Sequence, residues 1–247
     1  MSDAGRVRVE PSSKRVRVML GGEVIADTTR PLLVWEVPYF PTYYFPPGDV
    51  RAEFLSPTGE VKRSPSRGDA TQYAVTVGDA SGAAYAFHDS RIPESVDHYA
   101  FVWRTMDHWY EEDEEVFVHA RDPYTRLDIL PSTRRVRVVI DGVTVADSTG
   151  GRFLFETGLP ARYYLPKADV RMDLLTPTDK VTACPYKGTA RYWSATVNGD
   201  THEDIVWGYD DPFPESERIS GLVSFYNEKT DIYIDEVLQE RPRTKFS

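Results

Sequence analysis

A cysteine and a lysine stand close together in one short segment of the chain. Residues 182–188 read T-A-C-P-Y-K-G, and Cys184 is the only cysteine in the sequence. A neighbouring ammonium lowers the pKa of a thiol, and the thiolate is its reactive form. A lysine also serves as a base, or binds an anionic group as a point charge. Cys184 and Lys187 are therefore the candidate catalytic residues, with the alternative that Cys184 is simply a small buried residue.

The sequence repeats itself after about 120 residues. Matching positions include Val16 and Val136, Gly22 and Gly142, Pro46 and Pro166, and Gly68 and Gly188. The segment R-S-P-S-R-G at 63–68 matches the cysteine segment, with Ser64 in place of Cys184 and Arg67 in place of Lys187. This period is too long for a solenoid repeat. It predicts two whole domains, residues 1–120 and 121–247, of which the second has the more reactive segment.

Alternating patterns predict that both halves are mainly β. Val16, Val18 and Leu20 face one way while Arg15 and Arg17 face the other, as in a half-buried strand. Gly21-Gly22 and Asp141-Gly142 lie between two such runs, which is a strong hairpin signal. Strands are further expected at 50–55, 70–77 and 190–197, and a closing hairpin is expected from 221–226 and 231–235. Pro93 and Pro214 each begin a Pro-Glu-Ser segment typical of a short helix, so each domain should contain about one.

Composition and charge exclude several classes of protein. The net charge is −10 and the pI is about 5.0, which argues against nucleic-acid partners, since these require clustered Lys and Arg. A single cysteine forms no intrachain disulfide, which indicates a reducing compartment. No signal peptide or apolar run of membrane-spanning length is evident. The expectation is a cytoplasmic bacterial protein without membrane association.

An acidic run, E-E-D-E-E, occupies Glu111 to Glu115 near the end of the first half. Like charges repel, so the run is expected to be a solvated domain boundary. The alternative is a docking strip for a basic partner.

Metal sites are not expected. The five histidines include no pair at i, i+4, and no second cysteine is present for a zinc cage. A nucleotidyltransferase usually has a Gly-Ser turn followed by an Asp-x-Asp pair, and neither half contains that arrangement. Asp210 and Asp211 are adjacent and would face opposite sides of an extended strand.

Several blocks together resemble a known bacterial family. They are G-G-E-V-I-A-D, Y-Y-F-P-P-G-D-V-R, C-P-Y-K-G-T-A-R-Y-W and I-V-W-G-Y-D-D-P. They resemble the family catalogued as domain of unknown function 427, which also carries a nucleotidyltransferase-like label. The resemblance covers nearly the whole chain as two tandem copies. It implies a small Mss4-like, or β-tent, fold without the paired zinc cysteines of that group, and it implies no settled activity or cofactor.

The family pattern also adds residues around the cysteine turn of the second copy. These ligand-binding candidates are Glu156, Tyr192, Trp207 and Tyr209. Trp207 and Tyr209 alternate along a strand and so share a face, and aromatic walls with a few polar groups are typical of a pocket. The alternatives are that the rings are core residues and that Lys187 forms a structural pair with Glu156.

The first copy departs from the family pattern at Ser64, Ser66, Arg67 and Phe87. It is expected to be a degenerate scaffold, or a second pocket in which Arg67 contacts the ligand. The sequence predicts that the chain binds a small molecule around Lys187, Glu156 and Trp207. Whether it is also an enzyme is left open. The competing hypotheses are a non-enzymatic structural or interaction module and a nucleotidyltransferase-like enzyme. The sequence names no substrate, cofactor or oligomeric state.

Overall fold

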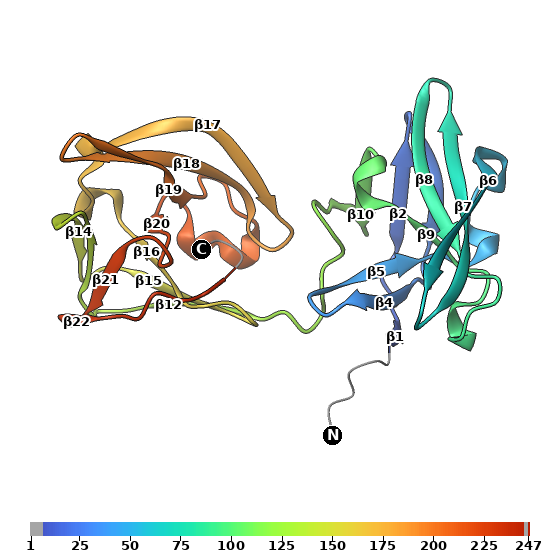
Figure 1. The fold of residues 1–247 in the computed structure, drawn as a ribbon, viewed down its shortest axis with the longest axis horizontal. Coiled ribbons are helices and arrows are strands. Elements are labelled where there is room, and N and C mark those ends of the chain that lie inside the picture. Colours follow the sequence, from blue (N-terminus) through green and yellow to red (C-terminus); the bar gives the residue numbers. More distant parts are fainter. Residues whose placement is uncertain (1–6, 245–246) are drawn as a thin grey trace. The chain divides into compact units, whose positions relative to one another are not determined.

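β-Strands and short 3-10 helices make up both halves of the chain (Figure 1). The computed structural model describes residues 7–244 and 247. The chain divides into two units, Met1–Asp122 and Pro123–Ser247. The fold is therefore two tandem, mainly β domains, as the sequence predicts.

The strands of the first unit are β1 (Arg8–Pro11), β2 (Val16–Leu20), β3 (Glu23–Thr28), β4 (Leu32–Val37), β5 (Phe40–Tyr44), β6 (Leu55–Ser64), β7 (Gly68–Val77), β8 (Ala80–Ala86), β9 (Tyr99–Phe101), β10 (His108–Glu111) and β11 (Glu114–Glu115). Its 3-10 helices are η1 (Pro47–Asp49), η2 (Ala52–Phe54), η3 (Pro93–Ser95) and η4 (Trp103–Thr105).

The strands of the second unit are β12 (Leu127–Pro131), β13 (Val136–Ile140), β14 (Val143–Ser148), β15 (Arg152–Glu156), β16 (Arg162–Leu165), β17 (Leu175–Cys184), β18 (Gly188–Val197), β19 (Asp200–Gly208), β20 (Val223–Phe225), β21 (Asp231–Ile234) and β22 (Val237–Leu238). Its 3-10 helices are η5 (Lys167–Asp169), η6 (Met172–Leu174) and η7 (Pro214–Ile219).

A curled seven-stranded sheet organises the second unit. Its order is β12-β15-β16-β20-β19-β18-β17, and a smaller sheet has the order β14-β13-β21-β22. Figure 1 shows β17, β18 and β19 arching over one side of this unit, with β12, β15 and β16 on the other.

The first unit has the same strand order with one weaker join. Its sheets run β1-β4-β5, β6-β7-β8-β9 and β11-β10-β2-β3. A single bridge between Phe45 and Tyr99 connects the first two sheets where β16 and β20 pair in the second unit. The two halves are therefore two copies of one topology, which explains the sequence repeat.

Each face of the large sheet of the second unit packs a separate apolar layer. Neighbouring residues point to opposite faces of a strand. Val206 therefore joins the main core, which lies against the smaller sheet, while Trp207 joins the other layer. This second layer includes Ile219 of η7, the helix enclosed by the arch in Figure 1, and so occupies the concave face of the sheet. It also includes Tyr164, Tyr192 and Tyr209. The candidate site residues thus belong to a layer distinct from the main core.

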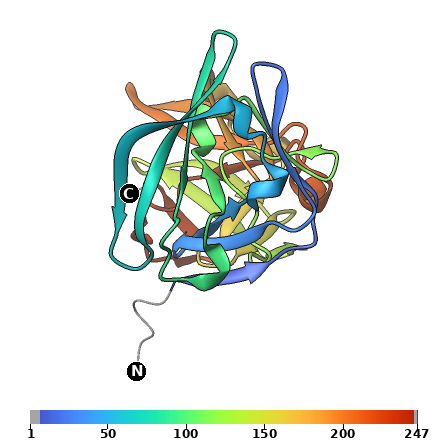
Figure 2. The same cartoon turned by 90° about the vertical axis from the view of Figure 1, so that its right-hand side faces the viewer.

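The predicted hairpin turns are confirmed. Gly21 and Gly22 connect β2 to β3 with φ of 58° and 80°, and Asp141 and Gly142 repeat this turn with φ of 48° and 78°. Such left-handed angles favour glycine and explain the sequence signal. Figure 2 shows the β2–β3 and β7–β8 turns projecting together, and a Cβ on Gly21 would lie 3.0 Å from the Val77 carbonyl oxygen.

Two strand predictions were wrong. Residues 50–55 contain the helix η2 before β6 begins at Leu55, so they form no continuous strand. Residues 221–226 and 231–235 do contain β20 and β21, but these strands do not pair with each other. β20 pairs with β16 and β19, whereas β21 pairs with β13 and β22. Local turn residues suggested a hairpin, but β20 pairs with β16 and β21 pairs with β13, strands that are distant in the chain and that local signals do not indicate.

The acidic run is only partly solvated. Asp113 has a side chain that is 95% exposed, but the side chain of Glu111 is 4% exposed. The Tyr43 hydroxyl donates a hydrogen bond to Glu111, and Lys14 Nζ lies 2.5 Å from its other oxygen. The expectation of a wholly solvated boundary was therefore wrong for Glu111, because a buried carboxylate is tolerated when it is paired.

Candidate functional site

The cysteine segment forms the turn between the two long strands β17 and β18. Cys184 pairs with Gly188 across the start of this hairpin. Gly188 has φ of 88°, and a Cβ there would lie 3.4 Å from the Asp211 carbonyl oxygen. The Phe213 amide also donates a hydrogen bond to the Lys187 carbonyl, at 3.3 Å. The turn is therefore held in place by the segment that precedes η7.

Lys187 extends from this turn to the carboxylate at the end of β15. Its Nζ lies 2.5 Å from Glu156 Oε2, and each side chain is 10% exposed. Burying two charges is costly, and only close pairing offsets the cost. The structure thus brings together the two charged residues that the sequence placed at the site.

The aromatic candidates line the concave face beside this ion pair. Tyr192 and Trp207 are cross-strand neighbours on β18 and β19, and both are nearly buried. Trp207 Nε1 donates to the Tyr164 hydroxyl at 3.1 Å, and the Tyr192 hydroxyl lies 2.8 Å from Thr182 Oγ1. These rings form a rigid wall, because most of their polar atoms already have partners.

Tyr209 and Cys184 belong to the same cluster. Burial raises the pKa of Tyr209 far above its usual value, and Tyr164, Cys184, Tyr192 and Glu156 raise it further by electrostatic interaction. Cys184 itself is half-buried. Among the described residues, no hydrogen bond joins its thiol to Lys187, whose ammonium is taken by Glu156. The structure therefore places the predicted residues in one cluster, but it pairs Lys187 with Glu156 and not with Cys184.

Ser224 is a candidate site residue that sequence reasoning missed. It lies on β20 opposite both Tyr164 and Trp207, so it shares their concave face. It is 0% exposed, and its Oγ has no hydrogen-bond partner within residues 7–244 and 247. The matching position of the first unit, opposite Tyr85, is Ala100. This Ala-to-Ser difference between the copies was the available signal.

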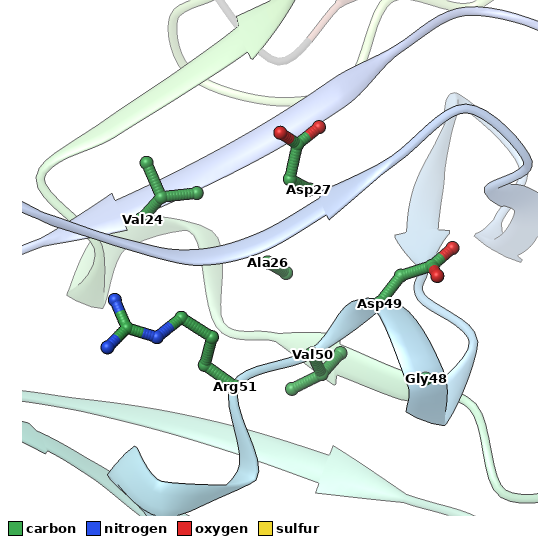
Figure 3. Close-up of a pocket in the computed structure, with 7 residues that line it drawn as sticks. All are labelled: Val24, Ala26, Asp27, Gly48, Asp49, Val50 and Arg51. Carbon is green, nitrogen blue, oxygen red and sulfur yellow. The ribbon is translucent and has the colours of Figure 1, made fainter.

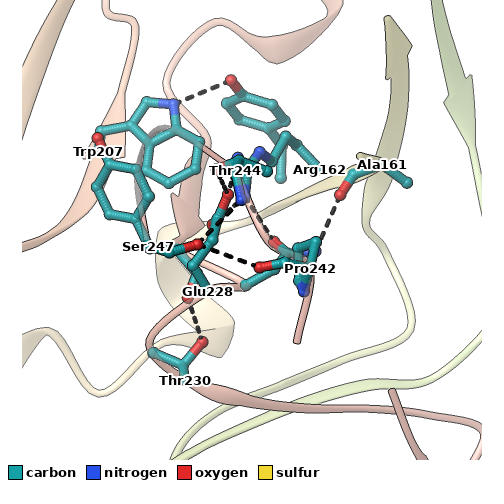
Figure 4. A network of polar contacts seen from close by, with 11 residues as sticks. Ala161, Arg162, Trp207, Glu228, Thr230, Pro242, Thr244 and Ser247 are labelled. Carbon is teal, nitrogen blue, oxygen red and sulfur yellow. Dashed lines mark hydrogen bonds and ion pairs between the residues drawn. The ribbon is translucent and has the colours of Figure 1, made fainter. Parts of the chain in front are cut away.

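A second buried ion pair lies next to Trp207 (Figure 4). Arg162 donates to both oxygens of Glu228 at 2.7 Å, and these side chains are 8% and 0% exposed. Thr244 Oγ1 also donates to Glu228 at 2.6 Å. Burial opposes ionisation of Glu228, but the hydrogen bonds from Arg162 and Thr244 leave its pKa lower than usual. The charges on this side of the site are therefore also paired.

The first unit builds a related cluster around Glu36. Arg67 and the hydroxyls of Tyr44 and Tyr85 all donate to its Oε1, the two hydroxyls at 2.6 Å each. Arg67 Nε also donates to Ser64 Oγ at 3.1 Å. Arg67 thus occupies the place of Lys187, in a network where the carboxylate has three donors on one oxygen.

A shallow pocket of about 310 Å³ lies elsewhere in the first unit (Figure 3). It is lined by Val24, Ala26, Asp27, Gly48, Asp49, Val50 and Arg51. None of the candidate site residues lines this pocket. Asp27 and Asp49 are already engaged there, by Arg15 and by Thr28 respectively.

Neither a metal cluster nor a membrane helix is found in the part of the chain that the structure describes. No group of three or more His, Cys, Asp or Glu side chains in that part could hold a metal ion. No helix within the same residues is long and apolar enough to cross a bilayer.

The fold and the paired clusters define a tandem of two related β domains, each with a buried carboxylate and a basic partner. The family model described as NTP_transf_9, domain of unknown function (DUF427), matches the chain over residues 8–112 and 128–236. The chain belongs to this family, with two copies of its domain. No curated protein shows significant similarity to it.

Proposed function

We propose that the second domain binds a small molecule on its concave face, between the Lys187–Glu156 pair and Ser224. The observation that carries the proposal is the unpartnered hydroxyl of Ser224, which lies fully buried beside Trp207. Buried polar groups are nearly always hydrogen-bonded, and each exception calls for an explanation. A ligand that accepts or donates a hydrogen bond at this point supplies one.

The second copy also has polar groups where the first copy has apolar ones. Tyr209 takes the place of Phe87, and within the described residues its hydroxyl makes no hydrogen bond. The fold does not require these hydroxyls, since the first unit has the same topology without them. Their joint presence on one face favours a ligand over a structural role.

The charges at the site favour a ligand with no net charge. Lys187 is paired with Glu156 and Arg162 with Glu228, so the described side chains here leave no unpaired charge for an ion to neutralise. In this proposal the Lys187–Glu156 pair orients polar groups of the ligand, and Trp207, Tyr192 and Tyr209 form its walls. Cys184, half-buried beside the pair, is the group proposed to react if the site is catalytic.

A ligand screen by thermal shift tests the proposal. Ligand at about 100 times its Kd stabilises a protein by about 2.7 kcal/mol. Hits from neutral polar compounds are expected with the wild-type chain and not with Lys187→Ala. Lys187→Arg, which installs the residue of the first copy, controls for the loss of the ion pair. Stabilisation by magnesium-dependent nucleotide binding would instead support the nucleotidyltransferase hypothesis, and no hits at all would support a structural module.

A further inference from the structure

The central carboxylate of the first domain, Glu36, has two cationic partners, whereas Glu156 of the second domain has one among the described residues. Lys62, on β6, lies 3.9 Å from Glu36 Oε2, and Arg67 is paired with the same carboxylate. Two cations therefore share a single acid. In the second domain the position of Lys62 is occupied by Thr182, and among the described residues Lys187 is the one cation paired with Glu156.

Each cation has a donor group that makes no hydrogen bond in the part of the chain that the structure describes. At 3.9 Å, Lys62 Nζ is too far from Glu36 for a hydrogen bond. Arg67 uses Nε for Ser64 and Nη1 for Glu36 and Tyr44. Within residues 7–244 and 247, neither Lys62 Nζ nor Arg67 Nη2 makes a hydrogen bond.

The surroundings of Lys62 also disfavour the charged form of its side chain. Its side chain is 37% exposed and its Nζ lies 3.5 Å from the centre of the Tyr85 ring. Burial lowers the pKa of Lys62, and Arg67 lowers it further, although Glu36 acts in the opposite direction. An anion beside both cations would remove this repulsion, and the exposed part of Lys62 provides access from solvent.

We propose that Lys62 Nζ and Arg67 Nη2 together bind a small oxyanion at the β6–β7 turn of the first domain. Arginine forms directed hydrogen bonds to oxyanions, and lysine adds a mobile charge. The exposed Ser66 hydroxyl, 3.3 Å from Ser64 Oγ, is a further hydrogen-bond donor on this turn. The two domains then take different ligands: an anion in the first and a neutral molecule in the second.

The test is a titration of the full chain with inorganic phosphate at constant ionic strength. Binding is monitored through the amide chemical shifts. Saturable shifts confined to residues of the β6–β7 turn are expected. Lys62→Thr, which installs the residue of the second domain, should weaken binding by about 10-fold or more. Lys62→Gln removes the charge but keeps a polar side chain only one atom shorter over Tyr85, and it should have a similar effect.

Arg63→Thr is the matched control, because it removes one positive charge from the next residue on the opposite face of β6. It should weaken binding by less than about 2-fold. Equal losses in Lys62→Thr and Arg63→Thr would indicate diffuse attraction and overturn the proposal. So would the absence of saturation up to about 100 mM phosphate. Neither result bears on the second domain, which is tested separately through Lys187.

Discussion

Lys187 Nζ lies 2.5 Å from Glu156 Oε2, and both side chains are largely withdrawn from water. The first domain repeats this relationship with Arg67 and Glu36. A buried ion pair is a poor source of net stability, because desolvation consumes most of the Coulombic gain. Its presence in both copies therefore points to a role in organising polar groups.

Removing one partner of this pair should be strongly destabilising. We expect Lys187→Met to lower the free energy of unfolding by about 3 kcal/mol, since it leaves Glu156 buried and unpaired. The double variant Lys187→Met/Glu156→Leu should recover much of this loss. Urea unfolding of the three proteins measures both effects. A single variant as stable as the wild type would show that Glu156 is solvated.

Exchanging Ser224 and the matching Ala100 between the domains should change the stabilities of the two domains in opposite directions. Ser224→Ala removes an unpaired buried polar group and should stabilise the ligand-free chain by about 1 kcal/mol. Ala100→Ser, the reverse change in the first domain, should destabilise it by a similar amount. Denaturation curves with assigned domain signals distinguish the two. Destabilisation by Ser224→Ala would mean that the hydroxyl has a partner.

Lowering the pH should destabilise the second domain through protonation of Glu228. Its pKa is lower in the folded protein than the ordinary value of 4.5, so the unfolded chain binds more protons as the pH falls. The contribution of Glu228 is therefore complete above about pH 4.5 and is lost as the pH falls through the folded pKa. Urea unfolding between pH 3 and 6 should show this loss. Arg162→Met/Glu228→Leu should flatten that part of the profile, and an unchanged profile would assign the acid sensitivity elsewhere.

Gly208 lets β20 approach the strand that carries Trp207. A Cβ at this position would lie 2.5 Å from the Leu222 carbonyl oxygen. Gly208→Ala should therefore destabilise the second domain by about 2 kcal/mol or more, because backbone must shift to accept the methyl group. Gly150→Ala, whose nearest contact would be 3.8 Å, is the control and should have little effect. Equal melting temperatures for the two variants would contradict the close approach.

The repeat made the architecture predictable from sequence. Alternation and the paired Gly turns located β2, β3, β13 and β14, because these signals act over a few residues. The pairing of β20 and β21 was not predictable in this way, since each joins a strand distant in the chain. Glu111 was placed in solvent because its distant partners, Lys14 and Tyr43, cannot be read from local charge.

Most residues of the candidate site could be predicted from the sequence, but not all of them, and their hydrogen-bond partners less well. The resemblance placed Glu156 near Lys187, and the structure pairs them. Ser224 was overlooked because a lone serine in an apolar strand carries no signal of its own. Only comparison with Ala100, through the register of β20 and β9, shows that it differs between the copies.

The most direct test of the central claim is a crystal structure of the full chain with the strongest neutral hit of the thermal-shift screen. The account predicts electron density for the compound on the concave face of the second domain, within hydrogen-bond distance of Ser224 Oγ and beside the Lys187–Glu156 pair. Density for the compound at any other place, with the Ser224 hydroxyl still without a partner, would contradict it.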